Sequence, residues 1–105
     1  MKLLTALAIT AVMFASSASA ADPDDLQKLK DTGNCIGCNL ESANLKGAYL
    51  FEAYLFESEL GGADLRKANL DGANLRDANL SYAIMMDAIL CNTTMPDGSV
   101  IYSGC

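Results

Sequence analysis

The sequence predicts an all-β solenoid, and two repeating positions carry that prediction. A leucine or methionine recurs every fifth residue through most of the 105-residue chain, at Leu40, Leu45, Leu50, Leu55, Leu60, Leu65, Leu70, Leu75, Leu80, Met85, Leu90 and Met95. A small residue stands two places earlier in each unit, at Cys38, Ala43, Ala48, Ala53, Ser58, Ala63, Ala68, Ala73, Ala78, Ala83, Ala88 and Thr93. Twelve units therefore follow one another without a break over residues 38–97.

A period of five suits neither an α-helix nor a flat strand. In a helix, five residues turn about 500°, so the leucines would drift by about 140° per unit and form no stripe. In a strand the odd period would move each leucine to the opposite face. A chain that turns a corner in every unit brings each leucine inward again, and stacked turns of such a chain bury one continuous core.

The units "ADLRK", "ANLDG", "ANLRD" and "ANLSY" resemble the pentapeptide-repeat family, whose motif is a small residue, Asp or Asn, Leu and two variable residues. The units "AYLFE", "AIMMD" and "AILCN" keep only the two inward positions. The resemblance implies a right-handed quadrilateral β-helix with four units per coil, and hence about three coils. With about 4.8 Å between strands, such a stack is about 14 Å tall.

The first twenty residues are typical of a secretory signal peptide. Lys2 gives a positive start, residues 3–14 are apolar, and Ala18-Ser19-Ala20 is a small-residue cleavage site. We expect removal after Ala20, and the alternative is a retained membrane anchor. The apolar run is short for a membrane span. The mature chain of about 85 residues is then a single domain.

The mature chain is acidic and lacks the groups that most catalytic sites need. It holds six basic and thirteen acidic residues, a net charge of −7, which disfavours binding to nucleic acid or to anionic lipid. It has no histidine. Its carboxylates mostly stand at outward positions, where we expect them to be solvated and to lack the burial of a catalytic carboxylate: Glu52, Glu57, Glu59, Asp64, Asp71, Asp77 and Asp87. We therefore expect no enzyme, no cofactor and no metal ion.

Both ends of the solenoid carry signals for a cap, as an open solenoid end would expose its core. Over residues 21–37, Asp22 is a helix cap, Pro23 suits the first helical position, and Gly33 suits the end. Leu26 and Leu29 would cover the first coil. At the other end residues 96–98 predict a turn, after which residues 100–102 of the 98–105 tail fold back over the last coil.

Four cysteines in an exported chain suggest disulfides, and three pairings are possible. Cys35 and Cys38 begin the stack, whereas Cys91 and Cys105 lie at its end. A bridge needs Cα atoms within about 7 Å, less than the height of the stack. We therefore favour Cys35–Cys38 and Cys91–Cys105.

The segment "CIGC" also allows a thiol–disulfide redox role for Cys35 and Cys38. That role normally requires a helix N-terminus after the first cysteine, where a β coil is expected here. A four-thiolate zinc site would need both ends of the stack at one point. Structural disulfides are the favoured interpretation.

Four of the seven aromatic residues lie in "AYLFEAYLFE", residues 48–57. Tyr49, Phe51, Tyr54 and Phe56 stand at outward positions on two adjoining faces of one coil. Exposed apolar patches tend to mark contact sites, and tyrosine is favoured at interfaces. These four residues form a candidate interaction patch, unless the N-terminal segment covers them. Ile84, Met86 and Ile89 form a weaker second patch.

"CIGCNLESANL" and "CNTTMPDGS" resemble exported pentapeptide-repeat proteins of cyanobacteria and plastids. That resemblance implies the periplasm or the thylakoid lumen. We expect a non-catalytic structural or protein-interaction module. Its partner would be an unknown protein or a second copy, with no nucleic acid and no membrane after signal cleavage. The alternatives are the thiol–disulfide role and an acidic mimic of DNA that binds type II topoisomerases, as some family members do.

Overall fold

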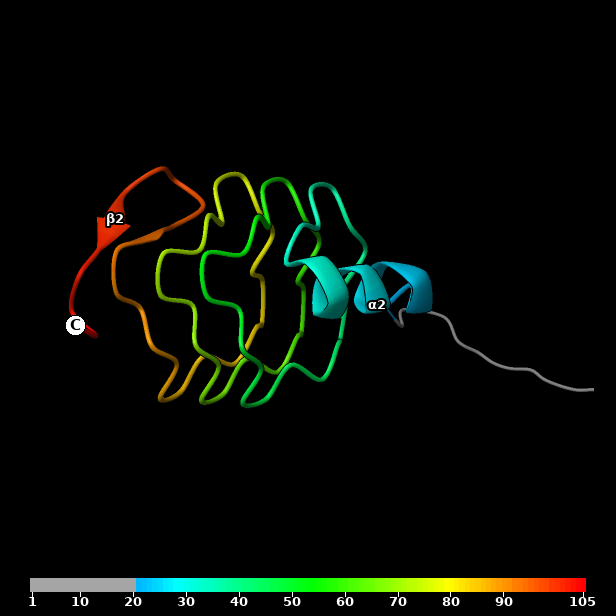
Figure 1. The fold of residues 1–105 in the computed structure, drawn as a ribbon, viewed down its shortest axis with the longest axis horizontal. Helices are drawn as coiled ribbons and strands as arrows, with labels where there is room; N and C mark the ends of the chain where they lie inside the picture. The colour runs from blue at the N-terminus through cyan, green and yellow to red at the C-terminus, as the bar shows by residue number, and fades with distance from the viewer. Residues whose placement is uncertain (1–20) are drawn as a thin grey trace, which may run out of the picture.

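The structure, a computed structural model, describes residues 21–105. The expected signal peptide at residues 1–20 lies outside the described residues. Figure 1 shows α2 (Pro23–Thr32) at one end, a chain wound into stacked layers, and a hairpin of β1 (Thr93–Thr94) and β2 (Val100–Ile101) at the other end.

Successive layers are joined by parallel bridges between residues twenty apart, which is four five-residue units. The bridges run from Asn34↔Tyr54 to Asn74↔Thr94. Between them the backbone hydrogen bonds repeat at a fixed offset. The Leu45 N–H donates to the Asp64 carbonyl at 2.8 Å, and the Asp64 N–H donates to the Ala43 carbonyl at 2.9 Å. Each layer therefore satisfies the backbone of the next, as in a parallel sheet.

The leucine positions and the small positions lie inside the stack, as predicted. Every leucine from Leu40 to Leu75 in the repeat is buried. Ser58 and Thr93 are the polar residues at inward positions, and both are fully buried. The Ser58 hydroxyl donates to the Leu55 carbonyl at 2.8 Å and the Thr93 hydroxyl to the Leu70 carbonyl at 2.7 Å, so neither carries an unmet donor.

The corners depend on a left-handed residue at the fifth position of each unit from 38–42 to 88–92. The chain has φ near +60° at Ser42, Glu52, Glu57, Lys67, Asp77, Tyr82, Asp87 and Asn92, and glycine takes several equivalent positions. The N–H that follows closes each turn, as where Ala43 donates to the Leu40 carbonyl at 3.0 Å. Eight residues other than glycine accept a conformation that is costly for a side chain, so the stacked layers must supply the compensating energy.

The Asn or Asp of the motif braces the same corners. Its side-chain oxygen accepts from the backbone N–H two residues later, as Asn74 does from Arg76 at 3.0 Å and Asn79 from Ser81 at 2.9 Å. This is the local turn that these short polar side chains favour. Units with tyrosine or isoleucine in that place lack the brace.

α2 closes one end of the stack and has the predicted boundaries. The Asp22 side chain accepts from the backbone of residues 24 and 25, and the Gly33 N–H, at φ 70°, donates to the Leu29 carbonyl. Leu29 is buried in the core, and Leu26 packs against it. The Asp25 carboxylate accepts from the Asn39 N–H at 2.8 Å, so α2 also satisfies a donor at the edge of the first layer.

The hairpin only partly covers the other end. β2 pairs antiparallel with β1, with Thr93 opposite Ile101. Tyr102 stays exposed, and Leu80, Met85 and Leu90 are only partly buried. The tail therefore folds beside the last layer, and the core at this end is less protected than beneath α2.

Disulfides join the two pairs that the sequence favoured. Cys35 bonds Cys38, with 5.2 Å between Cα atoms, and Cys91 bonds Cys105, with 4.8 Å. Cys35 takes a leucine position in a unit that precedes residue 38, and Asn34 already bridges to Tyr54. The ladder thus extends into a unit that lacks leucine, where the buried disulfide fills the core.

Candidate interaction surface

The four aromatic residues of the candidate patch lie on the outside of one layer. Tyr49 is 75% exposed, Tyr54 57% and Phe51 42%, while Phe56 is half-buried. The rings of Tyr49 and Phe51 stack, with centroids 5.9 Å apart. α2 leaves Tyr49, Phe51 and Tyr54 largely open to solvent.

The aromatic patch is confined to its layer along the stack. Tyr49 bridges to Asn69, and Tyr54 bridges to Asn74 on one side and Asn34 on the other. The Gly37 N–H donates to the Phe56 carbonyl, which places exposed Ile36 beside Phe56. The apolar surface therefore extends towards α2 and ends at a polar layer in the opposite direction.

The weaker patch at the far end is also exposed. Ile84, Met86 and Ile89 are each at least 42% exposed, and the tail leaves them open. Tyr82 in the same layer is 93% exposed. This end combines exposed side chains with the partly buried core positions described above.

The Cys35–Cys38 disulfide lies within the core. Cys35 is 0% exposed and Cys38 4%. Disulfide exchange requires an attacking thiolate to reach one of the sulfur atoms. The burial of both residues therefore disfavours the thiol–disulfide role that the CxxC spacing suggested.

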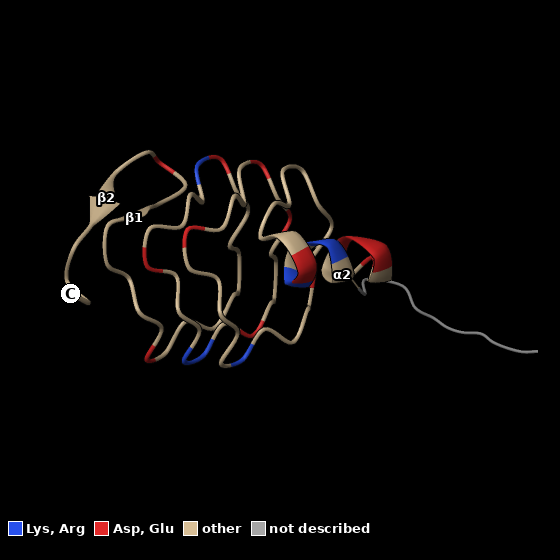
Figure 2. Ribbon diagram, viewed as in Figure 1, with Lys and Arg blue, Asp and Glu red and all other residues tan. Residues whose placement is uncertain are grey.

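Charged residues occur in α2 and along the layers of the stack (Figure 2). Asp64 and Arg66 form a two-pronged ion pair, with Nη2–Oδ2 at 2.7 Å and Nε–Oδ1 at 2.9 Å. The hydrogen bonds from Arg66 lower the pKa of Asp64 to about 2. Hydrogen bonds from Ser99 lower the pKa of Asp97, which lies in the hairpin turn. Each shift has a local structural cause.

Two further observations concern the kind of site that the described residues offer. Across residues 21–105, no three His, Cys, Asp or Glu side chains are arranged to hold a metal ion. In the same stretch, no helix is long and apolar enough to cross a membrane.

Comparison with known proteins identifies the fold family. The family model for pentapeptide repeats, in eight copies, matches residues 34–72 and 58–95. No curated protein matches the sequence.

Two solved structures are similar to the chain. One is a pentapeptide repeat protein from the Arabidopsis thaliana thylakoid lumen, with 40% identity, a TM-score of 0.54, and coverage of 62% of this chain and 44% of that one. The other is HetL, a pentapeptide repeat protein involved in heterocyst differentiation regulation from the cyanobacterium Nostoc, with 34% identity, a TM-score of 0.41, and coverage of 65% and 36%. The chain thus matches less than half the length of either protein.

The family match covers more than half of the chain and coincides with the bridged layers and the leucine core. The family match and the similar thylakoid-lumen protein imply a right-handed β-helix. The chain belongs to the pentapeptide repeat family.

Proposed function

We propose that the chain is an exported, non-catalytic module that binds another protein, or a second copy of itself, through Tyr49, Phe51, Tyr54 and Phe56. The observation that carries the proposal is an exposed aromatic cluster on one layer of the stack, next to a layer that is polar at the same positions. Large aromatic side chains supply much of the binding energy at protein interfaces.

The scaffold is a quadrilateral β-helix of about three coils. The bridges between residues twenty apart support four units per coil, because each unit has five residues. Four corners per coil place adjoining units on adjoining faces. The aromatic patch then covers one corner and the two faces beside it.

The compartment is the periplasm or the thylakoid lumen, after removal of residues 1–20. Two disulfides favour an oxidising compartment, and one similar protein comes from a thylakoid lumen. Nucleic acid and membrane are disfavoured as partners by the net charge of the mature chain.

The experiment replaces Phe51 and Phe56 by serine in the mature chain. Its control replaces Asp71 and Arg76 by serine, one layer along the same two faces, which leaves the net charge unchanged. Sedimentation at several concentrations measures self-association, and recovery of bound protein from extract of the native compartment measures partner binding. We expect only the aromatic variant to lose one of these interactions.

Two outcomes would contradict the proposal. A folded aromatic variant that self-associates and recovers partners like the wild type would show that the patch is not a contact surface. An unfolded aromatic variant would show that the rings stabilise the fold. Binding of the mature chain to a type II topoisomerase, with inhibition of supercoiling, would instead favour the DNA-mimic alternative.

A further inference from the structure

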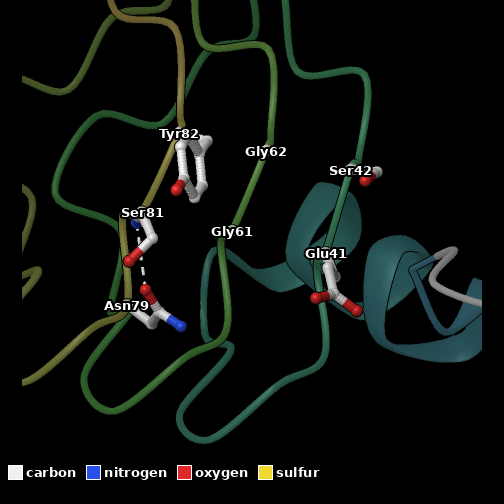
Figure 3. Close-up of a pocket in the computed structure, with 7 residues that line it drawn as sticks. All are labelled: Glu41, Ser42, Gly61, Gly62, Asn79, Ser81 and Tyr82. Carbon is white, nitrogen blue, oxygen red and sulfur yellow. Dashed lines mark hydrogen bonds between the residues drawn. The ribbon is translucent and has the colours of Figure 1, made fainter.

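A notch opens where two glycines interrupt the outer side chains of one corner (Figure 3). Its volume is about 360 Å³, and it is lined by Glu41, Ser42, Gly61, Gly62, Asn79, Ser81 and Tyr82. Residues 41, 61 and 81 are twenty apart, so they occupy the same corner in three successive layers. The notch therefore lies where Gly61 and Gly62 of the middle layer have no side chains.

The conformation of the backbone explains one of the two glycines. Gly62 has φ +68° and occupies the left-handed corner position. Gly61 has no positive φ, and a Cβ there would meet only ordinary contacts, at 3.7 Å or more. Other units place Phe51, Arg66 and Met86 at the equivalent position. The fold tolerates a side chain at residue 61, and its absence creates the notch.

The groups beside Gly61 are hydrogen-bond acceptors. A Cβ at residue 61 would lie 3.8 Å from the Glu41 Oε2 atom and 3.7 Å from the Ser81 carbonyl oxygen. That carbonyl accepts from the Gly62 N–H at 2.8 Å, and its second lone pair can accept another hydrogen bond. The Ser42 hydroxyl oxygen lies 3.3 Å from the corresponding point at Gly62. Among residues 21–105, no basic side chain lies within ion-pair distance of Glu41. These groups match a ligand that carries positive charge and N–H donors.

An aromatic ring borders the same place. Figure 3 shows the Tyr82 ring on one side of the glycine pair and the Glu41 carboxylate on the other. Tyr82 is 93% exposed, so its face is free for contact. With about 4.8 Å between layers, residues 41 and 81 stand about 10 Å apart, which leaves room for one side chain between them.

We propose that this notch binds the guanidinium group of an arginine side chain from a partner protein. A guanidinium has five N–H donors, pairs with a carboxylate and stacks on an aromatic ring. The notch offers a matching carboxylate, carbonyl oxygen, hydroxyl and ring. This inference deepens the proposed function and rests on it in one respect: the arginine belongs to a protein because the chain is proposed to bind a protein. The notch is separate from the aromatic patch.

The test titrates isotope-labelled mature protein with N-acetyl-arginine amide and, in parallel, with N-acetyl-citrulline amide, which has the same shape without the charge. Amide resonances of Gly61 and Gly62 report on the notch. We expect saturable shifts with arginine at millimolar concentration, and shifts at least threefold weaker with citrulline. Glu41→Gln should weaken arginine binding at least threefold.

Gly61→Met should abolish binding, because its side chain fills the notch as Met86 fills the equivalent position elsewhere. Gly47→Ala, at another corner, serves as the control and should bind like the wild type. Three results would overturn the proposal: no saturable shift at the notch, equal binding of citrulline, or unchanged binding by a folded Gly61→Met variant. Because the probe is a small molecule, these failures leave the aromatic patch and its own experiment unaffected.

Discussion

At the scale of single residues, each corner uses two positions of the unit in different ways: one takes the left-handed backbone conformation, and the other makes a side-chain hydrogen bond. The fifth residue is left-handed in each unit from 38–42 to 88–92, whether it is Glu52, Lys67 or Tyr82. The second residue braces the corner when it is Asn or Asp. The left-handed corner residues therefore strain the backbone in layer after layer, and the backbone hydrogen bonds between layers offset that strain.

Substitutions at Gly47 and Gly61 distinguish the effect of a left-handed backbone on stability from the effect of the space available to a side chain. Gly47 has φ +69° with nothing within 4 Å of an added Cβ, whereas Gly61 has no positive φ. Gly47→Ala should lower the free energy of unfolding by about 1 kcal/mol, because alanine disfavours the left-handed region. Gly61→Ala should leave stability unchanged or raise it slightly. Urea unfolding of both variants measures this, and equal stability of the two would contradict the role of the corner.

The Asp64–Arg66 pair gives the surface a defined response to pH. The pKa of Asp64 in the folded chain is about 2, below its ordinary value of 3.8. The pair therefore stabilises the fold above pH 3.8, and this contribution is lost as the pH falls towards 2. In Arg66→Gln the pKa should rise towards 3.8 without fully reaching it, since the backbone N–H of residue 66 still donates to Asp64. Carboxyl NMR titration measures the shift; an unchanged pKa would rule out the pairing.

At the scale of the elements, each five-residue unit acts as one side of the stack, with its leucine inside. Leu65 is 0% exposed, and Leu45 and Met85 take the same inward position in the two adjoining layers. Lys67 is exposed at the left-handed corner two residues later. Asp77 and Asp87 occupy the corner position equivalent to Lys67 in other units, so an aspartate is compatible with it.

Leu65→Asp and Lys67→Asp introduce the same side chain on opposite sides of one unit. The buried carboxylate of Leu65→Asp has no partner, and its burial should cost several kcal/mol, enough to prevent folding. Lys67→Asp should fold like the wild type, because the new carboxylate is solvated. Circular dichroism and thermal unfolding distinguish them. Equal folding of the two variants would show that the inward assignment is wrong.

The hairpin and tail are held to the last layer by Cys91–Cys105. The two cysteines are fourteen residues apart, and a loop of that length gives a stabilisation of about 3 kcal/mol. Replacing both by serine should lower the free energy of unfolding by about that amount. The circular dichroism spectrum should stay close to that of the wild type, because the central layers remain folded. Reduction of this disulfide in the wild type serves as an independent comparison. A double variant as stable as the oxidised wild type would contradict the effect.

The sequence predicted the interior of these elements better than their corners. The leucine phase and the bounds of α2 follow from local patterns, and the Cys91–Cys105 pair from the length of the stack. The left-handed corners were missed, because Glu, Lys and Tyr at those positions resemble any solvent-facing residues. The notch was missed because Glu41, Gly61 and Tyr82 meet only through stacking. Its one sequence signal was the glycine pair at residues 61 and 62.

At the scale of the whole molecule, the two ends and the outer surface differ in how far they are covered. α2 closes one end with buried Leu29 and a carboxylate bound to the layer edge. At the far end Leu80, Met85 and Leu90 remain partly exposed beside the hairpin. The aromatic patch adjoins the end closed by α2, whereas Tyr82 of the notch lies in the layer next to the hairpin. A partner that used both surfaces would extend along the stack.

The export hypothesis makes a prediction about the mature chain. Expression of the full sequence in a secreting host should yield periplasmic protein that begins at Ala21, since small residues at positions 18 and 20 define the cleavage site. Ala18→Glu together with Ala20→Glu should block processing and leave a larger form on the membrane. Mass spectrometry of both fractions gives the result. A wild-type chain that keeps residues 1–20 would favour the membrane-anchor alternative.

The twenty-residue register also restricts how this sequence can change length during evolution. An insertion of one to four residues turns later leucines outward, so selection for folding removes it. An insertion of one whole unit keeps the core but moves every later side chain to the adjoining face, and it would separate Glu41 from Gly61 and Tyr82 if it fell between residues 42 and 61. Only a gain or loss of twenty residues preserves both the core and the alignment of the outer side chains. A lineage that keeps the notch should therefore keep a constant length within residues 41–82, because even one added layer there would part Glu41, Gly61 and Tyr82, while outside them single units can come and go.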